Sequence, residues 1–305
     1  MGYVDFAQLN EAVSSPEQIE STLRYLTEQM RKFLRPHDRM LICFPDEGNG
    51  SIGNMLARAV SRAGASPVFW GRDNRWKTLL RIAFTTRASA IAAPPLIALG
   101  VTKLAKATGT PLYFRYVLTA GYPCMDWMID GICRGLDCQS WGCFGPGTKA
   151  VVGGFSCGHS RGVHLRTDAF DVEIVDENGE QVAEGVTGFP VITPKNRPDL
   201  RYHSGLHGRI DSSPCACGQD TPRLIDISAG DDAQEDLAKL GGDMLYWSSV
   251  LDCDLRIGEG GLEMELVVFR GEKLPKLPTC AKQVVRPWDP ERDKPMVMGS
   301  LWKKQ

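Results

Sequence analysis

Apolar positions in the first third of the chain alternate between helical and strand-like spacing. A 3.6-residue period behind the capping sequence Ser14-Ser15-Pro16-Glu17 predicts helix within about the first 35 residues. Its apolar stripe consists of Ile19, Leu23, Leu26, Met30 and Leu34. Short apolar runs predict strands at 39–44, 66–70 and 88–93, and helical patterns at 52–63, 76–85 and 95–108 follow them in turn. This alternation across short loops indicates a parallel α/β layer.

The pattern changes beyond residue 110, where Gly, Pro, Asn and Asp separate shorter apolar runs. The predicted elements are a helix at 126–135 and strands at 112–118, 162–165, 170–175, 188–193, 250–257 and 262–269. The polar stretch at 228–235 is typical of a hinge. We therefore predict an α/β fold with a β-rich subdomain and a small α+β C-terminal domain. The boundaries are a partial α/β subdomain at 1–149, the β-rich subdomain at 150–228 and the C-terminal domain at 229–305.

Composition and charge exclude several classes of protein. The 35 basic and 37 acidic residues balance to a net charge of −2, whereas a dedicated nucleic-acid binder usually has a basic excess. No apolar run approaches the ~18 residues of a membrane span, and the N-terminus lacks a signal-peptide pattern. We therefore expect a cytoplasmic protein without nucleic-acid or membrane partners. Its ten cysteines should be reduced thiols, some of them free to hold a metal.

An ordered set of motifs between residues 85 and 228 carries a family resemblance. These motifs are Thr119-Ala-Gly-Tyr-Pro-Cys124, Trp141-Gly-Cys-Phe-Gly145, the run from Cys157 to Asp176, Gly188-Phe-Pro-Val-Ile-Thr193, Leu200-Arg-Tyr-His-Ser-Gly205 and Pro214-Cys-Ala-Cys-Gly218. In this order they resemble the phenylacetate–coenzyme A ligase branch of the AMP-forming acyl-adenylate superfamily. The resemblance implies a partial large domain of that fold followed by a small lid.

The chain also departs from the family's pattern where ATP would bind. It lacks the family's Ser/Thr/Gly-rich phosphate loop, whose backbone amides would hold the phosphates. Gly145 replaces the magnesium-directed Glu of the family turn, and Leu206 replaces the Asp that accepts from the ribose. The hinge keeps only Asp231 and Asp232, and neither C-terminal lysine can be assigned as catalytic. We therefore expect neither Mg-ATP as a cofactor nor ordinary adenylation.

The resemblance also implies a ligand cleft. Its expected lining consists of Gly121, Trp141, Gly142, Gly145, Tyr202 and Gly205. Arg201 matches a family arginine and is a catalytic candidate, although a pair with Asp199 or Asp211 is the simpler interpretation. His203 is the second catalytic candidate, because a histidine titrates near neutral pH, but a solvated turn histidine like His207 is favoured.

Cys157, His164, Cys215 and Cys217 are the strongest chemical signal in the sequence. Three thiolates and an imidazole form a soft donor set that suits tetrahedral zinc. Four protein ligands leave no open position, so the predicted zinc is structural rather than catalytic, with His159 as a reserve ligand. The alternative is that these are small buried side chains with an incidental histidine.

Two further patterns have a functional and a plain interpretation. Cys124, Cys133, Cys138 and Cys143 are either core thiols, which we favour, or a second metal or redox site. Glycines at 48, 50 and 53, with Asp73 further on, have the spacing of a dinucleotide-binding loop. Because Asp46 and Glu47 would repel phosphate, a strand-to-helix turn is favoured there.

Together these features predict a truncated, degenerate relative of phenylacetate–coenzyme A ligases. It would be non-catalytic or altered, and would bind a small carboxylate, an acyl group or a protein partner. The alternative is an active acyl-CoA ligase or acyl transferase with a site rebuilt around Arg201, His203 and a cysteine. A thiol- or metal-handling protein is a third class. We also expect a homodimer, or a complex with a second protein, through residues 1–110.

Overall fold

The computed structural model describes most of the 305-residue chain. It covers residues 3–46, 48, 50–71, 74–121, 126–145, 151–229, 240–274 and 276–296, without the side chains of Phe6, Asp126 and Ala229. Several residues singled out above lie outside these ranges, namely Glu47, Asp73, Cys124, Asp231, Asp232, Lys303 and Lys304.

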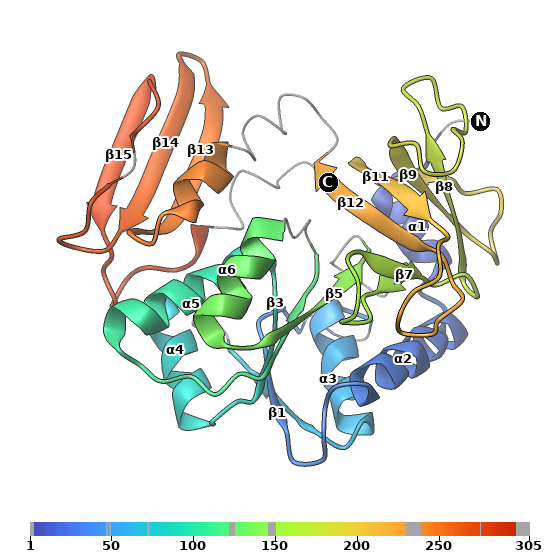
Figure 1. Cartoon of the computed structure of the whole chain (residues 1–305), viewed down its shortest axis with the longest axis horizontal. Coiled ribbons are helices and arrows are strands. Elements are labelled where there is room, and N and C mark those ends of the chain that lie inside the picture. The colour runs from blue at the N-terminus through green and yellow to red at the C-terminus, as the bar shows by residue number, and fades with distance from the viewer. Residues whose placement is uncertain are drawn as a thin grey trace.

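Five parallel strands form the centre of the molecule, in the spatial order β2-β1-β3-β4-β5 (Figure 1). The elements are β1 (Arg39–Ile42), α3 (Ile52–Arg62), β2 (Ser66–Phe69), α4 (Trp76–Thr85), β3 (Ala90–Ala93), α5 (Pro95–Thr108), β4 (Tyr116–Thr119), α6 (Asp126–Leu136) and β5 (Gln139–Phe144). The strand expected at 112–118 begins only at Tyr116, where pairing with Ala90 starts. The segment Trp141–Gly145, which we expected to be a turn, belongs to strand β5 for most of its length, because its backbone pairs with β4.

Helices cover both faces of this parallel sheet. The expected N-terminal helix is divided into α1 (Phe6–Ala12) and α2 (Pro16–Arg31). Helices α2 and α3 share one core with the sheet, and α4, α5 and α6 share another. Leu23, Leu26 and Met30 of the α2 stripe are completely buried, so this helix covers the sheet within the chain. Among the described helices, none is both long and apolar enough to cross a membrane.

The β-rich subdomain extends the central sheet. Strand β5 pairs antiparallel with β6, and β7, β12 and β11 follow, which makes one nine-stranded sheet. Strands β8, β9 and β10 form a second, antiparallel sheet. The bounds are β6 (Gly154–Phe155), β7 (Val163–Leu165), β8 (Phe170–Val175), β9 (Phe189–Pro194), β10 (Tyr202–His203), β11 (Leu206–Asp211) and β12 (Arg223–Ala229). The sheet therefore runs across the domain boundary expected at residue 149.

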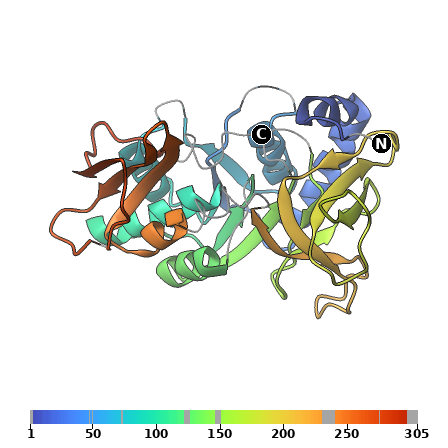
Figure 2. The same ribbon diagram turned by 90° about the horizontal axis from the view of Figure 1, so that it is seen from above.

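Beyond residue 240 the chain forms a short helical segment at 240–246 and a three-stranded sheet. Strands β13 (Val250–Gly258) and β14 (Gly261–Val268) form the expected hairpin, whereas β15 (Lys282–Pro287), parallel to β14, was not expected. The sequence of β15 is mostly exposed and lacks an apolar run. This sheet and the β-rich subdomain lie at opposite ends of the α/β layer (Figure 1 and Figure 2).

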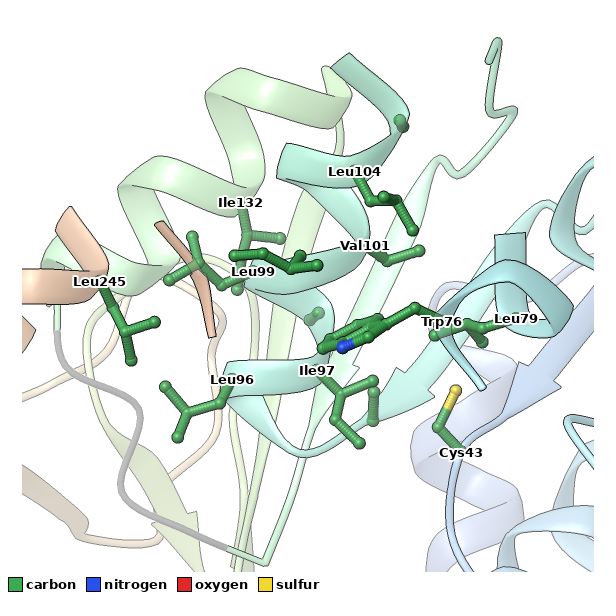
Figure 3. Close-up of a cluster of buried hydrophobic side chains, with 14 of the residues drawn as sticks. Cys43, Trp76, Leu79, Leu96, Ile97, Leu99, Val101, Leu104, Ile132 and Leu245 are labelled. Carbon is green, nitrogen blue, oxygen red and sulfur yellow. The ribbon is translucent and has the colours of Figure 1, made fainter. Parts of the chain in front are cut away.

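The C-terminal unit shares a hydrophobic core with the helices of the α/β layer. Leu245 belongs to the same buried cluster as Ile132 of α6, and its side chain projects toward Leu96 of α5 (Figure 3). Lys103 of α5 reinforces this contact, because its Nζ donates hydrogen bonds to the carbonyl oxygens of Leu245, of Trp247 at 3.0 Å and of Val250 at 2.7 Å. The C-terminal unit is thus docked through both apolar and polar contacts.

Candidate functional site

The four expected metal ligands come together at one end of the nine-stranded sheet. Cys157 follows β6, His164 lies in β7, and Cys215 and Cys217 occupy the turn between β11 and β12. Antiparallel pairing of β7 with both β6 and β12 brings these segments side by side. The four ligand atoms all lie within 4.8 Å of one another.

The spacing of these atoms suits a tetrahedral ion. A zinc ion with Zn–S bonds of about 2.3 Å holds two thiolates about 3.8 Å apart. The Sγ atoms of Cys157 and Cys215 are 3.7 Å apart, and Cys217 Sγ is 3.3 Å from His164 Nε2. The cluster could therefore hold a metal with only small adjustments.

The hydrogen bonds of His164 prepare it to act as a ligand. Its ring is almost fully buried, and Nδ1 lies 2.9 Å from the carbonyl oxygen of Thr221. A carbonyl can only accept, so Nδ1 carries the proton and Nε2 presents its lone pair to the three sulfurs. A carbonyl partner of this kind is a common orienting group for metal-bound histidines.

The cysteine sulfurs accept hydrogen bonds that favour the ionised form. Ser160 Oγ lies 2.8 Å from Cys215 Sγ, and the backbone N–H of Gln219 donates to Cys217 Sγ at 3.4 Å. Burial works against ionisation of Cys215, but hydrogen bonds from Ser160, the Cys217 backbone and His164 lower its pKa to about 5. Burial raises the pKa of Cys217. The pair can thus supply one thiolate at neutral pH before any metal binds. His159, the reserve ligand, instead bonds through Nδ1 to the carbonyl oxygen of Cys157 at 2.9 Å.

The candidate metal centre also positions the chain next to Trp141. Gly158, directly after Cys157, has a φ of +71°, and a Cβ there would lie 3.1 Å from the indole ring. Trp141 itself is only 7% exposed and stacks on Phe33 with ring centroids 4.7 Å apart. Its indole N–H has no hydrogen-bond partner among the described residues. Trp141 is therefore a core side chain against which the backbone at Cys157 and Gly158 packs. Its contact with a ligand stays a prediction.

Three glycines of the expected cleft lie in β5 or shortly after β4 and β5. Gly121 comes after β4 with a φ of +87°, and the N–H of Gly142 in β5 donates to Ser156 Oγ at 2.7 Å. Gly145, after β5, has a φ of +150°, and a Cβ there would lie 2.1 Å from the carbonyl oxygen of Val151. The backbone of the returning chain therefore occupies the space that a side chain at position 145 would need.

The remaining cleft residues lie around β10. Tyr202 is buried in an apolar cluster that also contains Phe144, and Leu206 packs partly buried against the same cluster. Gly205, with a φ of +67°, makes the turn between β10 and β11. Leu206, which the sequence resemblance places at a ribose-binding Asp, is thus a partly buried apolar side chain packed against this cluster.

Arg201 has a partner that the sequence did not indicate. Its guanidinium pairs with Glu173 at 2.8 Å and lies over the ring of Tyr3 at 5.5 Å. The expected alternatives, Asp199 and Asp211, pair with other arginines. Glu173 therefore balances the charge of Arg201, whose catalytic role stays a prediction.

His203 and His207 both pack against the ring of Phe189. Their ring centroids lie 4.9 Å and 4.3 Å from that of Phe189. Burial, together with the proximity of His207, lowers the pKa of His203. These histidines are therefore partly packed side chains rather than freely solvated turn residues, and His203 favours its neutral form.

The glycine-rich loop after β1 has a steric explanation. Gly48 and Gly50 have φ values of +96° and +90°, and a Cβ on Gly53 would lie 2.3 Å from the carbonyl oxygen of Pro45. The side chain of Asp46 accepts from Asn54 at 3.3 Å. The glycines are thus required by the backbone path between β1 and α3, and nucleotide binding there stays untested.

No family model matches the sequence, and no curated protein sequence matches it. Solved structures do match. A 2-hydroxyisobutyryl-CoA ligase in complex with 2-HIB-AMP has a TM-score of 0.68 at 15% identity, covering 84% of this chain and 59% of the ligase. A benzoate CoA ligase from Burkholderia xenovorans LB400 has a TM-score of 0.55 at 12% identity, covering 87% of this chain and 61% of the ligase. The amide bond synthetase McbA from Marinactinospora thermotolerans has a TM-score of 0.54 at 13% identity, covering 87% of this chain and 62% of the synthetase.

The chain has the fold of adenylate-forming ligases. It spans about 60% of the length of these proteins, which agrees with a partial large domain followed by a small C-terminal unit. The narrower resemblance to phenylacetate–coenzyme A ligases stays a prediction.

Sequence reasoning missed the groups that support the candidate metal centre in this ligase fold. Ser160 and Thr221 contact Cys215 and His164 from two different loops. A hydroxyl residue close to each ligand in the sequence is a weak signal, because Ser and Thr are common in loops. Only the folded arrangement distinguishes them.

Proposed function

We propose that this protein uses the adenylate-forming ligase fold to bind a small carboxylate or its acyl derivative, without ordinary ATP-dependent adenylation. The observation that carries this proposal is the backbone contact at Gly145. In the family that the sequence resembles, the equivalent position holds the magnesium-directed Glu. Here the carbonyl oxygen of Val151 lies 2.1 Å from where a Cβ would be, so the local chain path excludes any side chain.

Leu206 supports the same proposal from the ribose side. The residue that should accept from the ribose hydroxyls is apolar and packs with Tyr202 and Phe144. A hydrogen bond that involves a charged group contributes about 1.5–3 kcal/mol. Losing one such contact at Gly145 and one at Leu206 would cost about 3–6 kcal/mol, or roughly 10²–10⁴-fold in affinity for Mg-ATP.

The ligand class follows from what the ligase fold accommodates in its structural neighbours. Those neighbours are a hydroxyacyl-CoA ligase, a benzoate CoA ligase and an amide bond synthetase, and the first is seen with an acyl-adenylate. The features lost from this chain concern the nucleotide. The part of the fold that would hold the acid is therefore the part we expect to remain useful.

The test compares nucleotide and acid directly on the full-length protein. We expect no thermal shift with Mg-ATP, no acid-dependent exchange of pyrophosphate into ATP, and a saturable shift with one aryl or short-chain acid or its CoA thioester. Acid-dependent exchange would instead establish the alternative, a working ligase with a rebuilt site around Arg201 and His203. The absence of a shift with every acid and thioester tested would reject the ligand class.

We further propose that the metal centre holds one structural zinc ion. The four ligands are soft, closely spaced and provided entirely by the protein, so no position is left for a substrate. Metal analysis should find about one zinc per chain, and Cys217→Ser should lower that content. Cys280→Ser is the control, because this half-buried thiol lies outside the cluster. Metal-free protein of equal thermal stability would reject the assignment.

A homodimer through residues 1–110 remains part of the proposal. Strand β2 is an edge of the nine-stranded sheet, and Phe69 at its end is 37% exposed. Pro67 in the same strand lacks an N–H, which limits edge pairing, so side chains would supply most of the contact. Light scattering should show a dimer that Phe69→Asp weakens. Leu26→Asp is unsuitable as a test, because Leu26 is completely buried.

A further inference from the structure

The end of α6 brings two cysteines together. Asp137, directly after the helix, has a φ of +51°, and the N–H of Cys138 donates to the carbonyl oxygen of Cys133 at 3.2 Å. This bond pattern around a left-handed residue is a Schellman motif, in which the side chains at the two ends of the bond commonly touch. In most helices that contact is apolar. Here both side chains carry a thiol.

The turn that holds these cysteines is firmly packed. A Cβ on Gly135 would lie 2.2 Å from Thr102 of α5, and a Cβ on Gly131 would lie 3.3 Å from Leu99. The two glycines are one helical turn apart, so α6 approaches α5 closely along this face. The last turn of α6 is therefore held in place, and with it the position of Cys133.

The two sulfurs interact with each other and with the next strand. Each thiol shifts the pKa of the other, and the backbone N–H of Ser140 in β5 favours the ionised form of Cys133. The thiol of Cys138 also donates to the carbonyl oxygen of Ile132 at 4.0 Å. The interaction with Cys138 is the main cause that lowers the pKa of Cys133 to about 7, against the opposing effects of burial and Asp130. The same interaction raises the pKa of Cys138. One proton is therefore lost easily from the pair, and the thiolate forms on Cys133.

Both cysteines are partly open to solvent, and Cys138 also borders a cavity. The cavity has a volume of about 360 Å³ and is also lined by Arg115, Tyr116, Asp137 and Gln139. Tyr116 and Gln139 are the first residues of β4 and β5, so this cavity lies at the amino ends of the strands. Ligands of parallel sheets bind at the carboxyl ends, so the cavity is separate from the expected ligand cleft.

We propose that Cys133 and Cys138 form a reversible redox pair that is oxidised by a low-molecular-weight disulfide of the glutathione class. The Cys133 thiolate attacks one sulfur of the oxidised glutathione, breaks its S–S bond and releases one glutathione thiolate. The Cys138 thiol then loses its proton and attacks the sulfur of Cys133, which releases the second glutathione. The two protein thiols give up two electrons and two protons, and the glutathione disulfide takes them up.

Oxidation would tie the end of α6 to the start of β5. Strand β5 carries Trp141 and leads to Gly145 beyond its far end, so the disulfide would fix one end of the strand that borders the expected cleft. This role is independent of the ligand proposed above, because it needs only the two thiols and the helix end.

The experiment uses the full-length, metal-loaded protein and oxidised glutathione as the probe. After blocking of free thiols and digestion, peptide mass analysis should find Cys133 joined to Cys138 without bound glutathione, and dithiothreitol should reverse this. Cys138→Ser lacks the second thiol and should retain one glutathione on Cys133. Cys133→Ser removes the thiol whose pKa is lowered, so glutathione should add to Cys138 roughly tenfold more slowly than it adds to Cys133. Cys280→Ser should oxidise at the wild-type rate.

Two results would overturn the proposal. One is that both thiols of the wild-type protein remain open to alkylation in excess oxidised glutathione. The other is that Cys138→Ser retains no glutathione on Cys133, which would show that Cys133 is not the attacking thiol. Unfolding curves of each variant, recorded in parallel, distinguish a loss of reactivity from a loss of structure.

Discussion

Replacing Lys103 by Met should loosen the C-terminal unit from the rest of the protein. The ammonium group donates to the carbonyl oxygens of Leu245, Trp247 and Val250, and these contacts join α5 to residues more than 140 positions further along the chain. Methionine keeps most of the length and apolar surface of the stem but cannot donate. The variant therefore leaves three carbonyl groups without their partner.

The magnitude can be worked from these contacts. The carbonyls of Leu245 and Val250 are partly buried, whereas that of Trp247 is exposed and can bind water instead. Leaving a buried acceptor unpaired costs about 1–3 kcal/mol, so the two together cost about 2–6 kcal/mol. Burial lowers the pKa of Lys103 to about 7, which indicates that removing the charge recovers part of this cost. We expect a net loss of about 2–4 kcal/mol.

Urea unfolding of Lys103→Met measures the loss, and hydrogen exchange locates it. Protection should fall mainly in residues 240–270, while β1 and β3 stay protected. Lys106→Met is the matched control, because Lys106 lies on the same helix but is exposed, and it should change stability by less than about 0.5 kcal/mol. A loss below about 1 kcal/mol for Lys103→Met, or one spread evenly over the molecule, would refute the reasoning.

Three further results are expected. Removing metal with a chelator should lower the unfolding midpoint of the wild-type protein, and Cys215→Ser should have the same midpoint as the chelated protein. Equal midpoints before and after chelation would contradict this expectation. Gly145→Ala should destabilise by about 1–3 kcal/mol in thermal unfolding, because its Cβ would collide with the carbonyl of Val151, and a neutral result would mean that the loop readily moves away. The lowered pKa of His203 means that the unfolded state binds more protons near and below pH 6.5, so stability should fall as the pH falls through this range. In urea titrations at several pH values, His203→Gln should lose less stability than the wild-type protein as the pH falls. An unchanged pH dependence would argue against a lowered pKa of His203.

The sequence alone determined the elements whose signals are local. The helices at 76–85 and 95–108 were predicted with their observed bounds, because apolar periodicity, a proline at a first turn and a glycine at the end act over a few residues. The four candidate metal ligands were also predicted, because donor type and motif order can be read without coordinates. Trp141–Gly145 was placed correctly in the motif order, but its strand conformation depends on pairing with β4, more than 20 residues earlier.

Tertiary structure decided whatever depends on residues far apart in the chain. Strand β15 has few apolar residues of its own and forms because β14 offers it a partner. The pairing of Arg201 with Glu173 and the docking of Lys103 likewise join distant segments. Even the pair at Cys133 and Cys138, close in sequence, required the left-handed turn at Asp137 to bring its sulfurs together. A pattern of residues records local preference, whereas the partner of a backbone edge, a charge or a thiol is chosen only when the whole chain has packed.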